Sequence, residues 1–345
     1  MYEKIKNKVD KKLRKFINNI DKTYSLNKIS PLLFKSIKDF ILRDGKRIRP
    51  ILFITGYLGF ANKVAAELYT TALSIELLHD FMLVHDDIID KSEKRRGKAS
   101  MHKMLNNHLA QYKKIKFDGI DLAIITGDVM YAIAIKAFLS IKENMNRKEK
   151  ALKNFIEAAI YTGSGEFIEL TDGIRHIKNI TKENIYRIYD YKTARYTFSA
   201  PLVTGAILAG ADKNETDKLY KFGIYLGRAF QIKDDILGIF GKEKKIGKSI
   251  LSDLQEAKKT LLIWYAYNNS KKNERKIVER IFNKSKVGRK DLANIRRIIE
   301  ESGALNYAKD EINRLMFKAQ LLINSCHIKK KSKTFLVNYT KEIIN

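Results

Sequence analysis

A long run without proline or glycine, from Lys63 to Asp90, most constrains how this chain can fold. Its apolar residues recur three and four positions apart, which is the spacing of one face of an α-helix. The whole chain of 345 residues has three prolines and 18 glycines. Such sparse turn signals argue against a sandwich or barrel of many short strands. We therefore expect an all-α protein built from long helices.

The same spacing predicts further helices, and the first of them begins after Pro31 and ends before Asp44-Gly45. Others are expected over about 122–141, 152–170, 183–210 and 218–238, with amphipathic helices continuing to the C-terminus. Pro201 should kink the helix over 183–210. Residues 46–50 and 241–248 are interpreted as basic loops. No linker of shifted composition divides the chain, so we expect a single domain over residues 1–345.

From the cysteine usage and the charged N-terminal segment we expect a cytoplasmic protein. The single cysteine, Cys326, cannot form an intramolecular disulfide and is interpreted as an ordinary buried thiol. The N-terminal segment is charged from its third residue and lacks the apolar core of a signal peptide. The most apolar stretch, residues 123–139, contains Asp128 and Lys136 and is shorter than the roughly 20 residues that cross a bilayer. No transmembrane helix is expected.

The formal net charge is +28, from 67 Lys and Arg against 39 Asp and Glu. This excess could attract nucleic acid, an anionic membrane surface or acidic small substrates. Because the lysines are spread along the chain and do not form one block, we interpret most of them as a solvated surface. No nucleic-acid partner is expected. Nucleic-acid binding and peripheral contact with an anionic membrane remain alternatives.

Two aspartate pairs end otherwise apolar helices. Asp86 and Asp90 are one turn apart, so their carboxylates leave the helix about 40° and about 6 Å from each other. Asp234 and Asp235 form the second pair. Aspartates at a helix end are often only solvated, but carboxylates at a C-terminus oppose the helix dipole, and two such pairs favour cation sites. With no imidazole or thiolate ligand nearby, magnesium is the metal expected.

Basic groups in short motifs accompany these aspartates. Arginine holds phosphate with a planar fork, whereas lysine acts as a point charge. The pattern indicates one diphosphate held by magnesium and another held by side chains. The motifs contain Lys46, Arg47, Arg49, Arg95, Arg96, Lys192, Thr193, Lys248 and Lys258.

Several of these motifs, in this order, resemble the trans-isoprenyl diphosphate synthases, also called polyprenyl synthetases. They are GKRIRP, LLHDFMLVHDDIIDKSEKRRGK, YKTARYTFSAP and QIKDDILGIFGKEKKIGKSILSDLQEAKKT, within about residues 30–265. The resemblance implies a single all-α bundle around a deep central cavity, with the two aspartate motifs facing each other across its mouth. It also implies a homodimer.

The resemblance implies a role for each matching residue. Asp86, Asp90 and Asp234 are expected to bind magnesium, up to three ions per site, with support from Asp87 and Asp235. Isopentenyl diphosphate is assigned to Lys46, Arg49, His79 and Arg96, and Arg47 has a weaker claim. The allylic diphosphate is assigned to Arg95, Lys192, Thr193, Gln231, Lys248 and Lys258. The catalytic set is Asp86, Asp90, Arg95, Lys192 and Asp234.

The implied activity is head-to-tail condensation of isopentenyl diphosphate with dimethylallyl, geranyl and farnesyl diphosphates, by ionisation, condensation and elimination. In archaeal-type members a bulky residue five positions before the first aspartate motif limits product length, and Phe81 occupies that position, followed by Met82. We therefore expect a geranylgeranyl diphosphate synthase. The alternatives are a bifunctional farnesyl and geranylgeranyl synthase, a longer-chain synthase, a class I terpene cyclase and a non-catalytic partner subunit.

The sequence departs from the family pattern at the second motif. Gly238 lies where many members carry the final aspartate, so magnesium binding there is expected to be weaker or to use Asp234 and water. The segment from Ser249 to Ser252 is one residue longer than in some relatives, which leaves Lys259 as an alternative to Lys258.

Overall fold

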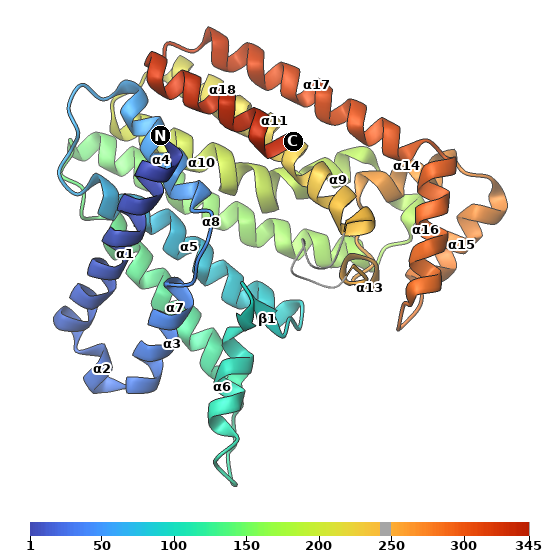
Figure 1. Ribbon diagram of the computed structural model, residues 1–345, viewed down its shortest axis with the longest axis horizontal. Helices are drawn as coiled ribbons and strands as arrows, with labels where there is room; N and C mark the ends of the chain where they lie inside the picture. Colours follow the sequence, from blue (N-terminus) through green and yellow to red (C-terminus); the bar gives the residue numbers. More distant parts are fainter. Residues whose placement is uncertain (242–249, 345) are drawn as a thin grey trace. The chain divides into compact units, whose positions relative to one another are not determined.

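The computed structural model describes residues 1–241 and 250–344. These residues form α-helices, short 3₁₀ and π segments, and a two-stranded antiparallel hairpin (Figure 1). The all-α architecture expected from the helical spacing is confirmed.

The bounds of the elements are α1 (Tyr2–Tyr24), α2 (Leu26–Ile29), α3 (Pro31–Ile41), α4 (Ile48–Phe60), α5 (Leu68–Ile89), β1 (Lys94–Arg95), β2 (Lys98–Ala99), α6 (Met101–Leu109), α7 (Gly119–Phe138), α8 (Met145–Gly173), η1 (Ile177–Asn179), α9 (Lys182–Ile188), η2 (Tyr189–Ser199), α10 (Ala200–Leu208), α11 (Lys213–Phe240), α13 (Ser252–Gln255), α14 (Leu261–Asn269), α15 (Lys272–Phe282), α16 (Arg289–Glu301), α17 (Ala304–Ser325) and α18 (Lys330–Ile344).

The chain divides into two compact units. Unit 1 comprises residues 1–153 and 204–210, and unit 2 comprises residues 154–203 together with the described residues from 211 onward. The single domain expected over residues 1–345 stays a prediction.

In unit 1 the central helix is α5, which packs against α1, α4 and α7. Its apolar residues Leu68, Leu73 and Leu77 are fully buried. Helix α1 was not among the expected helices, and it buries a stripe of aliphatic residues from Ile5 to Ile20. These residues are spaced three and four apart between lysines, so the stripe has the amphipathic period of a surface helix.

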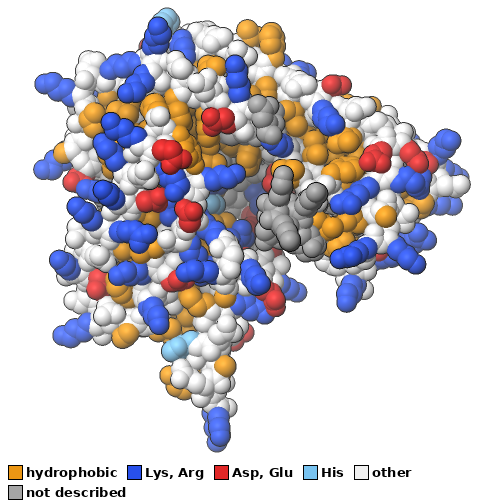
Figure 2. Space-filling model, in the orientation of Figure 1, with side chains coloured by type: hydrophobic (Ala, Val, Ile, Leu, Met, Phe, Trp, Pro, Cys, Tyr) orange, Lys and Arg blue, Asp and Glu red, His pale blue; other side chains and the backbone are white. Residues whose placement is uncertain are grey.

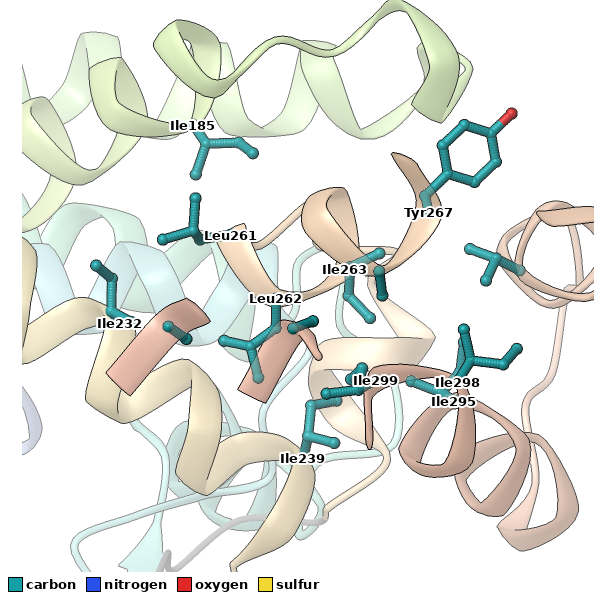
Figure 3. Close-up of a cluster of buried hydrophobic side chains, with 14 of the residues drawn as sticks. Ile185, Ile232, Ile239, Leu261, Leu262, Ile263, Tyr267, Ile295, Ile298 and Ile299 are labelled. Atoms are coloured by element: carbon teal, nitrogen blue, oxygen red, sulfur yellow. The ribbon is translucent and has the colours of Figure 1, made fainter. Parts of the chain in front are cut away.

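In unit 2 helix α11 packs against α17 and η2, and helix α14 packs against α17. Figure 3 shows the resulting aliphatic core, where Ile232 and Ile239 of α11 lie near Leu261 and Leu262 of α14. Burying each such side chain stabilises the fold by about 1.5–3 kcal/mol. This core positions the helix end that carries Asp234 and Asp235.

Two predicted boundaries near the N-terminus were wrong. Residues 46–50 were expected to be a loop, but α4 begins at Ile48 and includes Pro50. Proline is tolerated there because the first-turn N–H groups have no partner within the helix. The helix expected from Lys63 begins only at Leu68, after Glu67 with φ of 67°. The preceding turn is held by Tyr57, whose hydroxyl accepts a hydrogen bond from the backbone N–H of Ala65.

The helix expected over 183–210 changes its hydrogen-bond register. It consists of α9, the π-helix η2 and α10, and η2 ends two residues before Pro201. Proline lacks the N–H that an α-helix needs four residues after each carbonyl. Short π segments also occur often at functional sites, and η2 carries Lys192 and Thr193. The kink at Pro201 stays a prediction.

The other expected helices are present with shifted ends. They correspond to α3, α7, α8 and α11, whose starts lie up to seven residues earlier than expected. Asp118 and Asp212 accept hydrogen bonds from first-turn N–H groups of α7 and α11, and these side-chain caps set the observed starts. The β1–β2 hairpin was not expected, since it depends on the turn residues Arg96 and Gly97, whose φ values are 52° and 76°.

Cys326 is buried, as expected, and it anchors the junction of α17 and α18. Its thiol donates to Oε2 of Glu215 at 2.9 Å, and the backbone N–H of His327 donates to the same oxygen at 2.6 Å. Burial raises the pKa of the Cys326 thiol to about 12.

Among the described residues no helix is both long and apolar enough to cross a membrane. Figure 2 shows Lys and Arg side chains scattered over the visible face, interspersed with apolar and acidic groups.

We expect Glu215→Gln to lower the free energy of unfolding by about 1–3 kcal/mol at neutral pH, because it removes a buried charged acceptor. Burial alone would raise the pKa of Glu215, but hydrogen bonds from Cys326, Lys218 and His327 lower it to about 2. A lowered carboxyl pKa stabilises the fold above its unfolded value of 4.5, and this contribution disappears as the pH falls toward 2. The stability difference measured by urea unfolding should therefore be clearly smaller at about pH 3 than at neutral pH, and should vanish only at about pH 2 and below. An equal difference at both pH values would contradict the assignment.

Candidate active site

The first aspartate motif ends helix α5. Asp86 lies in its last turn and Asp90 is its C-cap, and a carboxylate oxygen of one lies within 4.8 Å of a carboxylate oxygen of the other. Both side chains are partly exposed. Two carboxylates so close to a helix C-terminus repel each other and the helix dipole. Their oxygens are the hard ligands that magnesium prefers, so the pair fits a divalent cation.

Arg95, from strand β1, neutralises part of this charge. Its Nε donates to Oδ1 of Asp87 at 2.8 Å, and its terminal nitrogen lies 3.2 Å from Oδ2 of Asp86. Asp87 is fully buried, and burial raises its pKa despite the guanidinium beside it. Asp87 therefore holds the hairpin against α5 through Arg95, and its support of a metal site stays a prediction. The Arg95 guanidinium thus lies next to Asp86 and Asp87.

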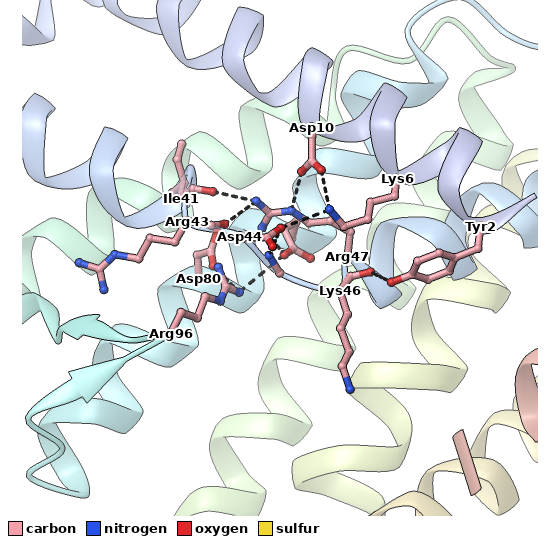
Figure 4. A network of polar contacts seen from close by, with 12 residues as sticks. Tyr2, Lys6, Asp10, Ile41, Arg43, Asp44, Lys46, Arg47, Asp80 and Arg96 are labelled. Carbon is pink, nitrogen blue, oxygen red and sulfur yellow. Dashed lines mark hydrogen bonds and ion pairs between the residues drawn. The ribbon is translucent and has the colours of Figure 1, made fainter. Parts of the chain in front are cut away.

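A network of buried charges lies deeper in unit 1, shown in Figure 4. Arg47 is 3% exposed and donates to Glu76 at 2.7 Å and to Asp10 at 2.9 Å. Arg96, in the turn of the hairpin, lies 3.2 Å from Asp80. Buried carboxylates of α5 thus hold both arginines in place. Arg47 is enclosed by protein on all sides, which makes its role structural.

His79 lies among arginines one turn from this network. Its pKa is held well below the ordinary value by burial and by the positive charges of Arg49, Arg96, Arg95 and Arg47. The imidazole is therefore neutral. A bound anion at this point would be attracted by the positive charges of the surrounding arginines. Lys46 is exposed, and Figure 4 shows its side chain pointing away from the buried network.

Phe81 lies on α5, five residues before Asp86. Its ring centroid is 4.7 Å from that of His85 and 5.2 Å from that of Tyr131 on α7. His85 fits there because residue 127 is glycine, since a Cβ at that position would overlap the imidazole. Met82 is half-buried beside Phe81. An aromatic group therefore bridges α5 and α7 below the aspartates.

In unit 2 the Lys192 side chain, on η2, forms ion pairs with helix α8. Its ammonium lies 2.7 Å from Glu166 and 2.5 Å from Glu169. Burial alone would raise the pKa of Glu169, but the positive charges of Lys192 and Lys258 lower it. Both glutamates therefore position Lys192.

A chain of hydrogen bonds connects η2 to the second aspartate motif. The Thr193 hydroxyl donates to Gln231 at 2.7 Å, and the Gln231 amide donates to Asp235 at 3.0 Å. The hydroxyl of Tyr189 donates to the other oxygen of Asp235 and accepts from the backbone N–H of Leu261 at 3.0 Å. Burial raises the pKa of Asp235 to about 8. Asp235 thus supports the motif from within, and its neighbour Asp234 is exposed.

Lys258 follows helix α13 in unit 2. Its ammonium is 2.8 Å from Glu256 and 3.8 Å from Asp253. Burial alone would lower its pKa, but Glu169, Glu256 and Asp253 raise it well above the ordinary value.

The alternative, Lys259, donates to the backbone carbonyl of Gly173. Lys258 is thus the lysine that lies among the acidic groups. Lys248 lies outside the described residues.

Within each unit the expected residues gather. In unit 1 these are Arg49, His79, Asp86, Asp90, Arg95 and Arg96, and in unit 2 they are Lys192, Thr193, Gln231, Asp235 and Lys258. The facing arrangement of the two motifs across a cavity stays a prediction.

Sequence reasoning missed the groups that hold these side chains. Among them are Glu76, Asp80, Glu166, Glu169 and Tyr189. Glutamates three apart on one helix, as at 166 and 169, are an available signal for a bound cationic side chain. Tyr189 had no comparable signal, since its partner lies 46 positions away.

Residues 30–300 match the family model described as Polyprenyl synthetase. The chain belongs to the polyprenyl synthetase family. It is 32% identical to the geranylgeranyl diphosphate synthase of Sulfolobus acidocaldarius, over 85% of this chain and 83% of the relative. It is also 32% identical to the geranylfarnesyl diphosphate synthase of Aeropyrum pernix, over 82% of this chain and 84% of the relative. The family resemblance of the motifs is therefore confirmed.

The fold of this polyprenyl synthetase is also that of a solved geranylgeranyl pyrophosphate synthase from Corynebacterium glutamicum, complexed with isoprenyl diphosphate and magnesium. The TM-score is 0.90 at 23% identity, covering 100% of this chain and 99% of that one.

We expect the neighbouring changes Arg47→Met and Lys46→Met to differ sharply in stability. Arg47→Met leaves Glu76 and Asp10 without their buried partner and should lower the free energy of unfolding by about 3–5 kcal/mol. Lys46→Met changes an exposed side chain and should shift it by less than about 0.5 kcal/mol. Urea unfolding measures both. Equal effects of the two changes would show that Arg47 is not the structural arginine.

Proposed function

We propose that the chain is a cytoplasmic head-to-tail prenyltransferase that condenses isopentenyl diphosphate with dimethylallyl, geranyl and farnesyl diphosphates and releases geranylgeranyl diphosphate. The observation that carries the proposal is the Asp86 and Asp90 pair at the end of α5, with Arg95 beside it and Arg49, His79 and Arg96 nearby. Acidic groups that fit a cation, next to basic groups that fit a diphosphate, support a reaction between two substrates that each carry a diphosphate group.

Each diphosphate is assigned to a set of side chains. Isopentenyl diphosphate would bind at Lys46, Arg49, His79 and Arg96, where arginine charge surrounds a neutral imidazole. The allylic diphosphate would bind at Arg95, Lys192, Thr193, Gln231, Lys248 and Lys258. The buried carboxylates of α5 hold Arg96 in position, and the α8 glutamates hold Lys192. Such preorganised charge needs little rearrangement during the reaction.

In the reaction the allylic C–O bond breaks and pyrophosphate leaves with the electron pair. The isopentenyl double bond then forms the new C–C bond, and the departing pyrophosphate accepts the proton whose loss restores a double bond. Arg95, Lys192 and Lys258 would stabilise the negative charge that builds up on the departing pyrophosphate. The apolar residues that precede Asp86 on α5 would keep water from the cationic prenyl chain.

Magnesium would be held by Asp86, Asp90 and Asp234, with up to three ions per site. When bound, it supplies positive charge to the diphosphate oxygens.

The aromatic group below the aspartates supports a short product. The prenyl chain is expected to extend from Asp86 toward Phe81, whose ring is braced by Tyr131 and His85. Sequence identity does not decide the length, since the geranylgeranyl and geranylfarnesyl synthases named above are equally similar to this chain. We therefore assign the twenty-carbon limit to Phe81, with Met82 beside it.

We further propose a homodimer. Helix α7 exposes Ile120, Ile124 and Ile125, which are 37%, 40% and 56% exposed; Ile120 and Ile124 are one turn apart, and Ile125 follows Ile124 directly. An apolar stripe of this kind on a helix fits burial against a second copy of the chain.

We expect Asp86→Ala to lower turnover of isopentenyl and farnesyl diphosphates by at least about 10²–10³-fold, because it removes half of the carboxylate pair. Glu93→Ala, which changes an exposed carboxylate seven residues away, is the matched control and should keep full activity. Product formation with magnesium measures both, and circular dichroism checks folding. Full activity of Asp86→Ala, together with salt-sensitive binding of nucleic acid, would favour the nucleic-acid alternative.

We expect Phe81→Ser to lengthen the products, because it removes the ring that blocks the prenyl chain. Phe81→Tyr keeps the ring and should keep the product distribution. Chromatography of the products made from farnesyl and isopentenyl diphosphates measures the change. An unchanged distribution for Phe81→Ser would show that another residue limits the chain.

A further inference from the structure

The connection between α6 and α7 combines lysines with exposed apolar side chains. Every residue from 110 to 118 is exposed. Tyr112, Ile115 and Phe117 are 55%, 42% and 47% exposed. Interleaved with them along the chain are Lys113, Lys114 and Lys116. We call residues 112–117 the tip. Large apolar side chains gathered on a water-exposed segment are typical of an interaction site.

The tip projects from the rest of unit 1, and the two helices that carry it are fastened together at its base. Figure 1 shows the segment after α6 extending away from the other helices of unit 1, and Figure 2 shows basic and apolar side chains on this projection. The backbone N–H of Gly119 donates to Oδ1 of Asn106 at 2.8 Å. A Cβ at residue 119 would overlap the carbonyl oxygen of His102, so α6 and α7 meet closely at this glycine. The tip is therefore presented on a firm base.

No acidic group compensates the positive charge of the tip. The sequence from residue 101 to residue 117 contains neither Asp nor Glu. Within the part of the chain that the structure describes, the three tip lysines form no ion pair. By contrast, Lys103 on α6 lies 3.2 Å from Glu93. The first acidic residue after the tip, Asp118, accepts from the N–H of Ile120 at 2.6 Å and caps α7. The three charges of the tip are thus available to an anionic partner.

Lysines interleaved with apolar side chains fit the surface of an anionic bilayer. Ammonium groups are attracted to lipid phosphates, aromatic rings prefer the headgroup level, and an aliphatic side chain gains by entering the acyl boundary. Nucleic acid would attract the lysines and could stack on the rings, but it offers no apolar surface to Ile115. A symmetric contact between two tips would place like charges opposite each other. The charge and the apolar groups together therefore favour lipid.

We propose that the tip is a membrane-docking element, which binds anionic lipid headgroups through its three lysines and inserts Tyr112, Ile115 and Phe117 at the bilayer interface. The inference does not rest on the proposed function, since it uses no residue of the candidate active site. Where that function holds, an enzyme docked in this way would form its amphipathic product beside a bilayer. The competing explanation is a solvated loop whose lysines only keep the protein soluble.

Flotation of the whole chain with phosphatidylglycerol vesicles, and with phosphatidylcholine vesicles for comparison, measures binding without substrate. We expect binding to the anionic vesicles alone, and raising the ionic strength should weaken it. Replacing all three tip lysines by Gln should weaken binding by about 100-fold, because each lysine near an anionic surface contributes about fivefold. Replacing Tyr112, Ile115 and Phe117 together by Ser should weaken it by at least about tenfold at unchanged charge.

The matched control removes three exposed lysines of unit 2 by the combined changes Lys276→Gln, Lys286→Gln and Lys290→Gln. It loses the same net charge as the tip lysine variant and should bind anionic vesicles nearly as the wild type does. Circular dichroism checks that every variant is folded. Equal losses in the two lysine variants would overturn the inference, because net charge alone would then explain binding. Full binding by the serine variant would also overturn it.

Insertion is measured separately with a polarity-sensitive fluorophore attached to Ile115→Cys. The native Cys326 is 1% exposed and burial raises its thiol pKa to about 12, so a maleimide label reacts at the introduced cysteine. The emission should shift to the blue with anionic vesicles, whereas the same label at Lys276→Cys should not shift. An unshifted spectrum at position 115 would overturn the inference, and so would a serine variant that loses self-association but keeps vesicle binding. A wild-type protein that binds vesicles but makes no prenyl product would contradict only the proposed function.

Discussion

The pairing of buried charges on helix α5 is the interaction on which unit 1 depends. Glu76, Asp80 and Asp87 point into the protein, where an unpaired carboxylate would be costly, and each meets an arginine from another segment. These contacts fix the α3–α4 connection and the β-hairpin against α5. The more exposed Asp86 and Asp90 then lie at a helix end whose surroundings are held together by these ion pairs. Buried acids therefore determine where these arginines lie.

In unit 2 hydrogen bonds stabilise the buried aspartate of the second motif. Asp235 is buried beside Asp234, and its two oxygens accept from Tyr189 and Gln231. Tyr189 also accepts from the start of α14, so the aspartate motif, the π-helix and the aliphatic core form one connected structure. The change of register in η2 brings Tyr189, Lys192 and Thr193 to their separate partners. Unit 2 therefore positions its aspartate motif through a hydrogen-bond network, in which Asp235 is buried and Asp234 is exposed.

The proposed chemistry follows from the contrast between these held groups and their exposed neighbours. In the segment 46–49, Arg47 is buried in ion pairs whereas Lys46 is exposed. In the first motif, Asp87 is buried against Arg95 whereas Asp86 and Asp90 are partly exposed. The same division separates Asp235 from Asp234. Buried and more accessible residues thus alternate within each of these motifs, and the proposed functional roles fall on the more accessible ones.

Periodicity and motif order by themselves determined the all-α class, the main helices, the family and the residue types of the site, because helical spacing and charged motifs are local properties. They did not determine helix α1, the β-hairpin, the π-helix or the starts of α4 and α5, which depend on caps, turn residues and a distant tyrosine. Nor could they connect Lys192 to Glu166 and Glu169, or Tyr189 to Asp235. Those pairs are far apart in the chain, and only tertiary packing brings their side chains into contact.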